Sequence, residues 1–157
     1  MIEEDYVSFE AAKLLKEKGF NHWCYKSYGT AVYHKGIPIS FDEECDLKSA
    51  GLENEIEYVE GGYLYDFGCD NRKKDAKVWA APTLWVAMKW LRKVHKIGVF
   101  PSTYAFAVGE NGSVKHVYGT AIINLETYEL MTNDLMPMPT YEEATEVAIK
   151  YCLENLI

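Results

Sequence analysis

The sequence has no closely spaced cysteines. Its four cysteines, Cys24, Cys45, Cys69 and Cys152, lie far apart in a chain of 157 residues, and no C-x-x-C pair occurs. Zinc sites usually bring their ligands in close pairs. We therefore expect no metal and no other cofactor, and four free, reduced thiols.

A long apolar run and a leader segment are also missing. Nothing approaches the run of about 18 apolar residues that a membrane span needs. Residues 1–5, Met-Ile-Glu-Glu-Asp, are acidic and lack the apolar centre of a signal peptide. These absences predict a cytoplasmic protein with no membrane segment.

Glycine-rich phosphate-binding loops are absent as well. The glycine-rich turns are Gly61-Gly62 and the segment from Gly109 to Gly112. Neither matches a P-loop or a dinucleotide fingerprint, and neither opens a predicted helix. We interpret both as hairpin turns, the first joining strands 55–59 and 63–67.

No catalytic constellation is visible. No local signature surrounds any cysteine, and the scattered histidines and carboxylates have no catalytic spacing. His95 lies near the end of a predicted helix, where a protonated imidazole is favoured. We assign no catalytic residue and expect no enzyme, although a hydrolase using these scattered groups stays open.

The charges are unevenly distributed. The net charge of −8 argues against non-specific binding to a polyanion. Ten acids and one base occupy residues 42–70, whereas eight bases and one acid occupy residues 72–96. This predicts a solvated acidic loop, with at most a helical turn near residues 42–47, next to a basic helix face.

Three segments have helical patterns. The most apolar runs over residues 81–97, with Pro82 in its first turn and Gly98 as its end. Its apolar stripe is so wide that we expect neighbours on more than one side. A helix over 9–18 has Ser8 as its N-cap, and a helix over 141–154 follows the Thr140 and Glu143 capping box.

Alternating apolar residues predict the strands. A strand over 22–34 turns at Lys35-Gly36 into residues 37–40, and 78–80 form a short strand. Strands over 104–108, 114–125 and 128–131 form a meander. The predicted fold is α+β: an antiparallel β-sheet, with a meander in the C-terminal half, and three helices. The central helix is packed in the core of a single α+β domain over residues 1–157.

Three stretches resemble a known family. They read YVSFEAAKLLKEKGF (6–20), APTL with AMKWLR (81–84 and 87–92), and YEEA with AIKYCLENLI (141–144 and 148–157). They are similar to small proteins carried by gut bacteria and by their phages or mobile elements. The family has no known activity, so the resemblance implies a cytoplasmic, phage-related setting and transfers no functional residue.

The leading hypothesis is a non-catalytic protein-interaction module that binds a second copy of itself or a host factor. Abundant tyrosine and tryptophan, without a catalytic pattern, motivate it. The predicted interaction surface comprises Tyr63, Tyr65, Phe67, Arg72, Lys73 and Lys74. Nucleic acid is not the expected partner, because the acids of residues 42–70 lie just upstream. An acidic decoy that inhibits a host DNA-binding protein is the alternative.

Overall fold

The computed structural model folds into two compact units, unit 1 of residues 1–20 with 82–157 and unit 2 of residues 21–81. The structure describes residues 5–73, 76–108, 110–112, 114–132 and 134–157, and only the backbone at 104–108 and 114–115. The fold is α+β with antiparallel pairing, as predicted, but the described strands form two sheets instead of the one sheet predicted. The single domain stays a prediction, and each unit is described by itself.

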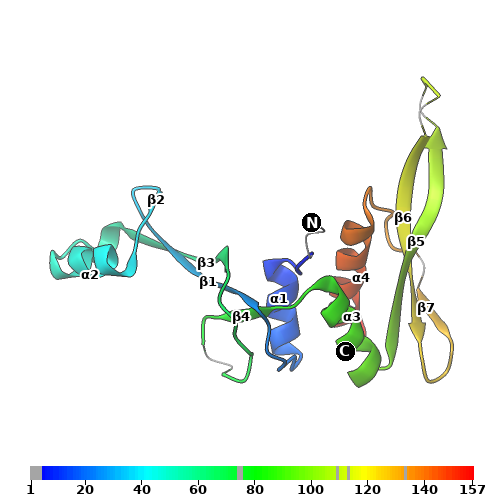
Figure 1. Cartoon of the computed structure of the whole chain (residues 1–157), viewed down its shortest axis with the longest axis horizontal. Coiled ribbons are helices and arrows are strands. Elements are labelled where there is room, and N and C mark those ends of the chain that lie inside the picture. The colour runs from blue at the N-terminus through cyan, green and yellow to red at the C-terminus, as the bar shows by residue number, and fades with distance from the viewer. Residues whose placement is uncertain (1–4, 74–75, 109, 113, 133) are drawn as a thin grey trace. The chain divides into compact units, whose positions relative to one another are not determined.

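Unit 1 combines three helices with one sheet (Figure 1). The helices are α1 (Phe9–Glu17), α3 (Leu84–Val94) and α4 (Tyr141–Asn155), and the strands are β5 (Ile97–Val108), β6 (Val114–Asn124) and β7 (Leu130–Thr132). The strand order is β5-β6-β7, with antiparallel pairing. Both α3 and α4 pack against β5, and α4 also contacts β6 and α1.

The predicted meander has the wrong bounds. Its first strand begins at Ile97 rather than at residue 104, because Pro101 lies opposite Thr120 without ending the strand. Its last strand begins at Leu130 rather than at residue 128, because Tyr128 has a φ of 61°. The predicted turn at Gly109 lies partly outside the described residues.

The core of unit 1 comes from its helices and the centre of β6. Its largest fully buried side chains are Leu15, Phe20, Leu91, Ile122, Ile149 and Leu153. The rings of Phe20 and Trp90 meet edge to face, with centroids 5.6 Å apart. Helix α1 ends within one residue of the predicted position 18, where Gly19 has a φ of 89° and the Phe20 N–H donates to the Leu15 carbonyl.

The predicted central helix is shorter and less covered than expected. It starts after Thr83, whose hydroxyl accepts a hydrogen bond from the Val86 N–H, so Pro82 precedes the N-cap. Leu84, Ala87, Trp90 and Leu91 are buried, but Trp85 is 61% exposed. Successive helix residues point 100° apart, so Trp85 lies beside the buried stripe and not within it.

The end of α3 also differs. Lys96 has a φ of 57°, and Gly98 lies inside β5, where a Cβ would come within 2.5 Å of the Phe100 ring. The prediction that His95 favours protonation is wrong. Burial lowers its pKa, because Nε2 is buried without a hydrogen bond to any described residue.

Unit 2 is a four-stranded antiparallel sheet that carries a helix. Its elements are β1 (Lys26–His34), β2 (Ile37–Pro38), α2 (Phe41–Ser49), the short 3₁₀ helix η1 (Glu53–Glu55), β3 (Ile56–Tyr65) and β4 (Trp79–Ala81). Strand β1 is central: β3 pairs along its length, and β2 and β4 pair with its opposite ends.

The predicted hairpin at Gly61-Gly62 is wrong. Both flanking segments belong to the single strand β3, and the two glycines form a bulge between the pairs Gly29–Tyr63 and Thr30–Glu60. Gly61 has a φ of 67°. A Cβ on Gly62 would lie 2.9 Å from the Ala31 Cβ. The glycines therefore allow β3 to stay paired with β1 across the irregularity.

The described residues contain four helices rather than three, because α2 replaces the predicted acidic loop. Ser40 accepts a hydrogen bond from the Glu43 N–H, and the Glu43 carboxylate accepts one from the Ser40 N–H. This is a full capping box. At α4 the described bonds include only the first half, from the Glu143 N–H to the Thr140 hydroxyl. No helix in the described part of the chain has the length and apolar character of a membrane span.

Candidate functional site

The predicted aromatic surface is partly assembled in unit 2. Tyr63 and Tyr65 lie on one face of β3 and their rings touch, with centroids 4.8 Å apart. Both are exposed, although Tyr65 also covers Gly29 of β1. Phe67 lies two residues beyond the end of β3 and is 69% exposed. Of the three predicted aromatic residues, Tyr63 and Tyr65 therefore share one face of the strand, and Phe67 lies beyond it.

Two further aromatic residues join this end of unit 2. Trp23 and Tyr25 are both exposed and meet edge to face at 4.8 Å. Gly68 lies under Trp23, since a Cβ there would come within 2.2 Å of the indole ring. The alternation of Trp23 and Tyr25 within the predicted strand 22–34 is the signal that could have identified them.

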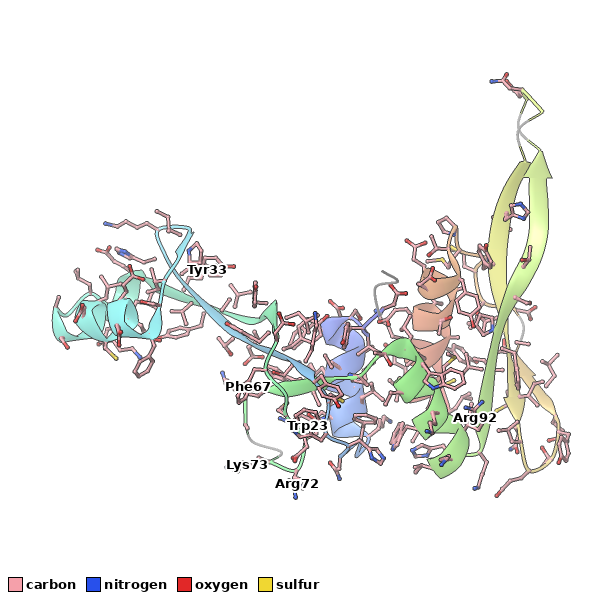
Figure 2. All side chains as sticks on the ribbon, viewed as in Figure 1. Trp23, Tyr33, Phe67, Arg72, Lys73 and Arg92 are labelled. Carbon is pink, nitrogen blue, oxygen red and sulfur yellow. The ribbon has the colours of Figure 1, made fainter. Side chains whose placement is uncertain are left out.

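One basic residue of the predicted surface, Arg72, is less available to a partner than expected. Figure 2 shows Arg72 and Lys73 at the same end of unit 2 as Trp23 and Phe67. The Arg72 guanidinium is bound by Asp70, through Nε at 2.8 Å and a terminal nitrogen at 2.6 Å. This pairing lowers the pKa of Asp70. Lys73 is exposed, and Lys74 lies outside the described residues.

Unit 2 buries few of its apolar side chains. Among its described residues the buried apolar side chains are Cys24, Ala31, Trp79, Ala80 and Ala81. The exposed large apolar side chains are more than twice as numerous: Trp23, Tyr25, Ile37, Phe41, Leu52, Tyr58, Val59, Tyr63, Tyr65, Phe67 and Val78. Where such side chains lie side by side, as Tyr63 lies against Tyr65 and Trp23 against Tyr25, they form the kind of exposed apolar patch that marks interaction sites.

The acidic residues gather at the other end of unit 2. Helix α2 has no buried residue and carries Asp42, Glu43, Glu44 and Asp46. It is attached to β3 through Glu44, whose Oε1 accepts from Lys48 Nζ at 2.6 Å and from the Tyr58 hydroxyl at 2.7 Å. A cavity of about 390 Å³ lies beside the helix, lined by His34, Ile39, Glu43, Asp46, Leu47 and Ala50.

Two cysteines of unit 2, Cys24 and Cys69, lie on neighbouring segments. Cys24 and Cys69 face each other across a β-bridge with reciprocal backbone hydrogen bonds of 2.8 and 3.1 Å. Burial raises the pKa of the Cys24 thiol to about 12. No three potential ligands gather anywhere in the described part of the chain. A thiol with such a pKa is a poor nucleophile.

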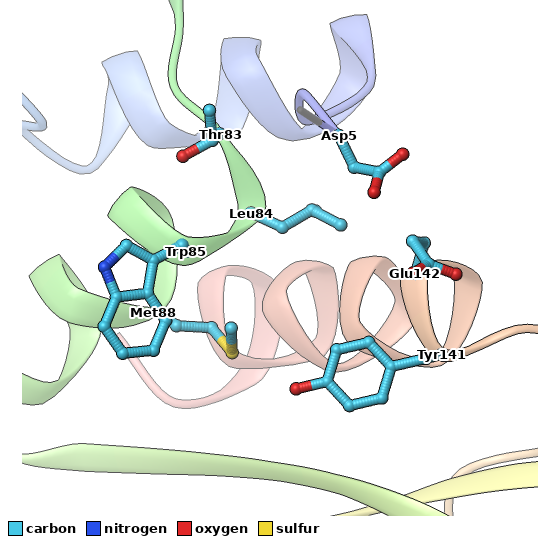
Figure 3. A pocket seen from close by; sticks show the side chains of 7 residues that line it. All are labelled: Asp5, Thr83, Leu84, Trp85, Met88, Tyr141 and Glu142. Atoms are coloured by element: carbon cyan, nitrogen blue, oxygen red, sulfur yellow. The ribbon is translucent and has the colours of Figure 1, made fainter. Parts of the chain in front are cut away.

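Unit 1 contains an open pocket of about 390 Å³ (Figure 3), which sequence reasoning missed. It is lined by Asp5, Thr83, Leu84, Trp85, Met88, Tyr141 and Glu142. Trp85 and Met88, which belong to the apolar helix predicted over 81–97, line this pocket opposite carboxylates, whereas Leu91 of the same helix is fully buried. No local signal joins residues 5, 85 and 141, because α3 and α4 meet only in the tertiary fold.

The comparisons with known proteins add no family. No protein-family model, curated protein or solved structure matches the chain. The resemblance to proteins of gut bacteria and their phages stays a prediction. The function must therefore be argued from the two ends of unit 2 and from the pocket in unit 1.

Proposed function

We propose that the chain is a non-catalytic protein-interaction module and that the aromatic end of unit 2 is its contact surface. One observation carries the proposal: among the described residues of unit 2, exposed large apolar side chains far outnumber buried ones. The aromatic surface is defined here as Trp23, Tyr25, Tyr63, Tyr65 and Phe67.

Covering the aromatic surface would add to the stability of unit 2. A unit of about 60 residues buries only about 60% of the surface of its unfolded chain, so it is marginal even with a good core. Unit 2 leaves most of β3 exposed, and its helix α2 buries nothing. A partner that covers the aromatic surface removes apolar area from water, at about 25 cal/mol for each Å².

The composition of the surface favours a protein as the partner. Tyrosine and tryptophan are enriched at the centres of protein interfaces, where their rings pack and their polar atoms bond. Two of the neighbouring cations are already paired within the unit, Arg72 with Asp70 and Lys26 with Asp66. A polyanion gains less from cations that are paired in this way.

A second copy of the chain is the first partner to test. We expect size-exclusion chromatography with light scattering to show concentration-dependent self-association. The triple variant Tyr25→Ser, Tyr63→Ser, Phe67→Ser should shift the protein towards the monomer. Tyr128→Asn is the control, because Tyr128 is exposed in unit 1 and asparagine tolerates its positive φ.

A host factor is the other partner class. If the wild type is monomeric, immobilised protein should capture a partner that the triple variant loses and the control variant keeps. A strict monomer that captures no protein through these three side chains would refute the proposal.

The acidic helix supports a second candidate, the decoy that occupies a DNA-binding protein. The supporting observation is that α2 buries none of its residues and exposes Asp42 and Asp46, whereas Glu43 caps the helix and Glu44 is bound by Lys48 and Tyr58. Here the partner is a basic protein surface, and its affinity should fall steeply as salt screens the charges. This candidate would be refuted if no such protein bound, or if its affinity stayed the same between roughly 50 and 300 mM salt.

A further inference from the structure

The pocket in unit 1 lies where the beginnings of two helices meet. Trp85 and Met88 come from the first turns of α3, Tyr141 and Glu142 from the first turn of α4, and Asp5 from the segment before α1 (Figure 3). A hydrogen bond of 2.9 Å from the Leu84 N–H to the Asp5 carbonyl holds that segment against α3. The walls are therefore tied to regular structure.

The floor and walls of the pocket suit an apolar group of small size. Leu84, Trp85 and Met88 form the apolar part, and the Tyr141 ring forms another wall (Figure 3). A volume of about 390 Å³ lies in the range of small-molecule sites. An apolar ligand alone, however, would leave the acidic side of the pocket unused.

The acidic side consists of Asp5 and Glu142. Neither carboxylate forms an ion pair or a side-chain hydrogen bond with the residues that the structure describes. Glu142 is not needed as a cap, because the Thr140 hydroxyl already accepts from the Glu143 N–H. Both carboxylates are thus free to accept hydrogen bonds from a ligand.

The Trp85 ring already contacts a cation of the chain itself, outside the pocket. The Arg92 guanidinium lies 5.5 Å from the centre of the Trp85 ring. Arg92 lines a neighbouring cavity of about 220 Å³ and is not among the residues of the acidic pocket. The contact shows that this ring is accessible to a guanidinium, as the charge distribution of indole predicts.

We propose that this pocket binds an organic cation, an alkylguanidinium or alkylammonium group, whose stem packs on Leu84, Trp85 and Met88. The charged group lies against the Asp5 and Glu142 carboxylates. Attraction to the two carboxylates favours the charged form over a neutral group of the same shape. This site lies in unit 1 and does not depend on the proposed contact surface of unit 2.

The first test uses two probes that differ in charge. N-butylguanidinium is titrated into the full chain, and binding is followed by calorimetry and by the tryptophan fluorescence of the chain. We expect N-butylguanidinium to bind at least tenfold more tightly than N-butylurea, its neutral analogue. Equal affinity for the two probes, or binding of neither, would overturn the proposal.

Matched variants locate the site. Asp5→Asn and Glu142→Gln should each weaken the binding of N-butylguanidinium about tenfold, because each removes one charge and keeps the shape of the side chain. Glu154→Gln, an exposed position at the other end of α4, is the control and should leave the affinity unchanged. Unchanged affinity in both pocket variants would also overturn the proposal. Near-ultraviolet circular dichroism checks that each variant is folded.

A peptide arm identifies the source of the cation. Ac-Gly-Arg-Gly-NH₂ presents the same guanidinium on a protein backbone. Competition between this peptide and N-butylguanidinium, lost in Glu142→Gln, would support a partner's arginine side chain as the ligand. Binding of N-butylguanidinium alone would support a free small molecule. The self-association test of unit 2 should be unaffected by these variants, so the two proposals can fail separately.

Discussion

Ser8 and Glu146 join the two ends of unit 1. Ser8, the N-cap of α1, donates both its backbone N–H, at 3.2 Å, and its hydroxyl to Oε1 of Glu146 in α4. The contact spans 138 positions of the sequence. Burial raises the pKa of the Glu146 carboxyl, although the bonds from Ser8 and the charge of Lys150 act in the opposite direction. The Glu146 carboxylate thus accepts two hydrogen bonds in a buried position that disfavours its ionised form.

Glu146→Gln should raise the free energy of unfolding at neutral pH and leave it nearly unchanged at pH 4. A carboxyl whose folded pKa is raised contributes stability that is fully present below its unfolded pKa, near 4.5. That contribution is lost as the pH rises through the folded pKa, whereas glutamine keeps the acceptor and carries no charge. Urea unfolding of both proteins at pH 4 and pH 7 measures the difference. A difference that does not change with pH would contradict this account.

His95→Phe should reduce the loss of stability on acidification. The pKa of His95 is lowered in the folded state by burial, so its contribution is complete above the unfolded pKa, near 6.5. The contribution is lost as the pH falls from there through the folded pKa. Phenylalanine can keep the edge contact with Trp90, now at 4.5 Å, without binding a proton. Thermal midpoints at pH 7.5 and 5.5 test this, and equal acid sensitivity in the two proteins would refute it.

Ser40→Ala should unfold α2 without unfolding the rest of the chain. The substitution removes the hydroxyl that accepts from the Glu43 N–H, and such caps contribute about 1 kcal/mol. Because α2 buries no residue, its loss costs the core nothing. Hydrogen exchange should show faster exchange of amides 43–50 with an unchanged global unfolding midpoint.

Thr140→Ala is the matched comparison for the α2 variant. It removes the same type of cap from α4, which contributes Ala148, Ile149 and Leu153 to the core of unit 1. We expect a global loss of about 1 kcal/mol, measured as a shift of the unfolding midpoint. A global loss of the same size in Ser40→Ala would show that α2 is coupled to the core.

Gly62→Ala should destabilise the pairing of β1 with β3 by about 1–3 kcal/mol. The added Cβ would lie 2.9 Å from the Ala31 Cβ, and two strands cannot separate there without breaking hydrogen bonds. The double variant Ala31→Gly, Gly62→Ala removes the Ala31 Cβ that the new methyl group would meet, and it should restore part of the lost stability. Urea unfolding of the single and double variants measures the coupling free energy between positions 31 and 62. Additive changes in the free energy of unfolding would show that the contact between these positions is unimportant.

The four thiols should react with a thiol reagent in the order of their exposure. Cys45 is exposed and should react first, and Cys69 is partly covered. Cys24 and Cys152 are buried, and desolvation raises the pKa of each to about 12. Both should react only in denaturant, because the thiolate is the reactive species. Rapid labelling of Cys24 in the native protein, located by mass spectrometry, would contradict the burial of the β1 end of unit 2.

Local sequence signals were sufficient for the ends of several elements. The Schellman end of α1, the caps at Ser8 and Thr140, and the turn at Lys35-Gly36 all follow from residues within one turn of each other. The capping box of α2, Ser40 with Glu43, was equally visible, but the density of acids there led to a prediction of loop. A capping signal outweighed the charge pattern, since the acids of the first turn also favour the helix dipole.

The sequence by itself determined the α+β class and the ends of α1 and α4, because caps, glycine turns and periodicity act between residues that are near in the chain. Only the tertiary structure decided that Gly61-Gly62 bulges instead of turning, because that depends on pairing with β1 some thirty residues earlier. It likewise decided that Trp85 is exposed and that Asp5, Trp85 and Tyr141 share a pocket. Those relationships are made by packing between distant segments, for which no local pattern exists.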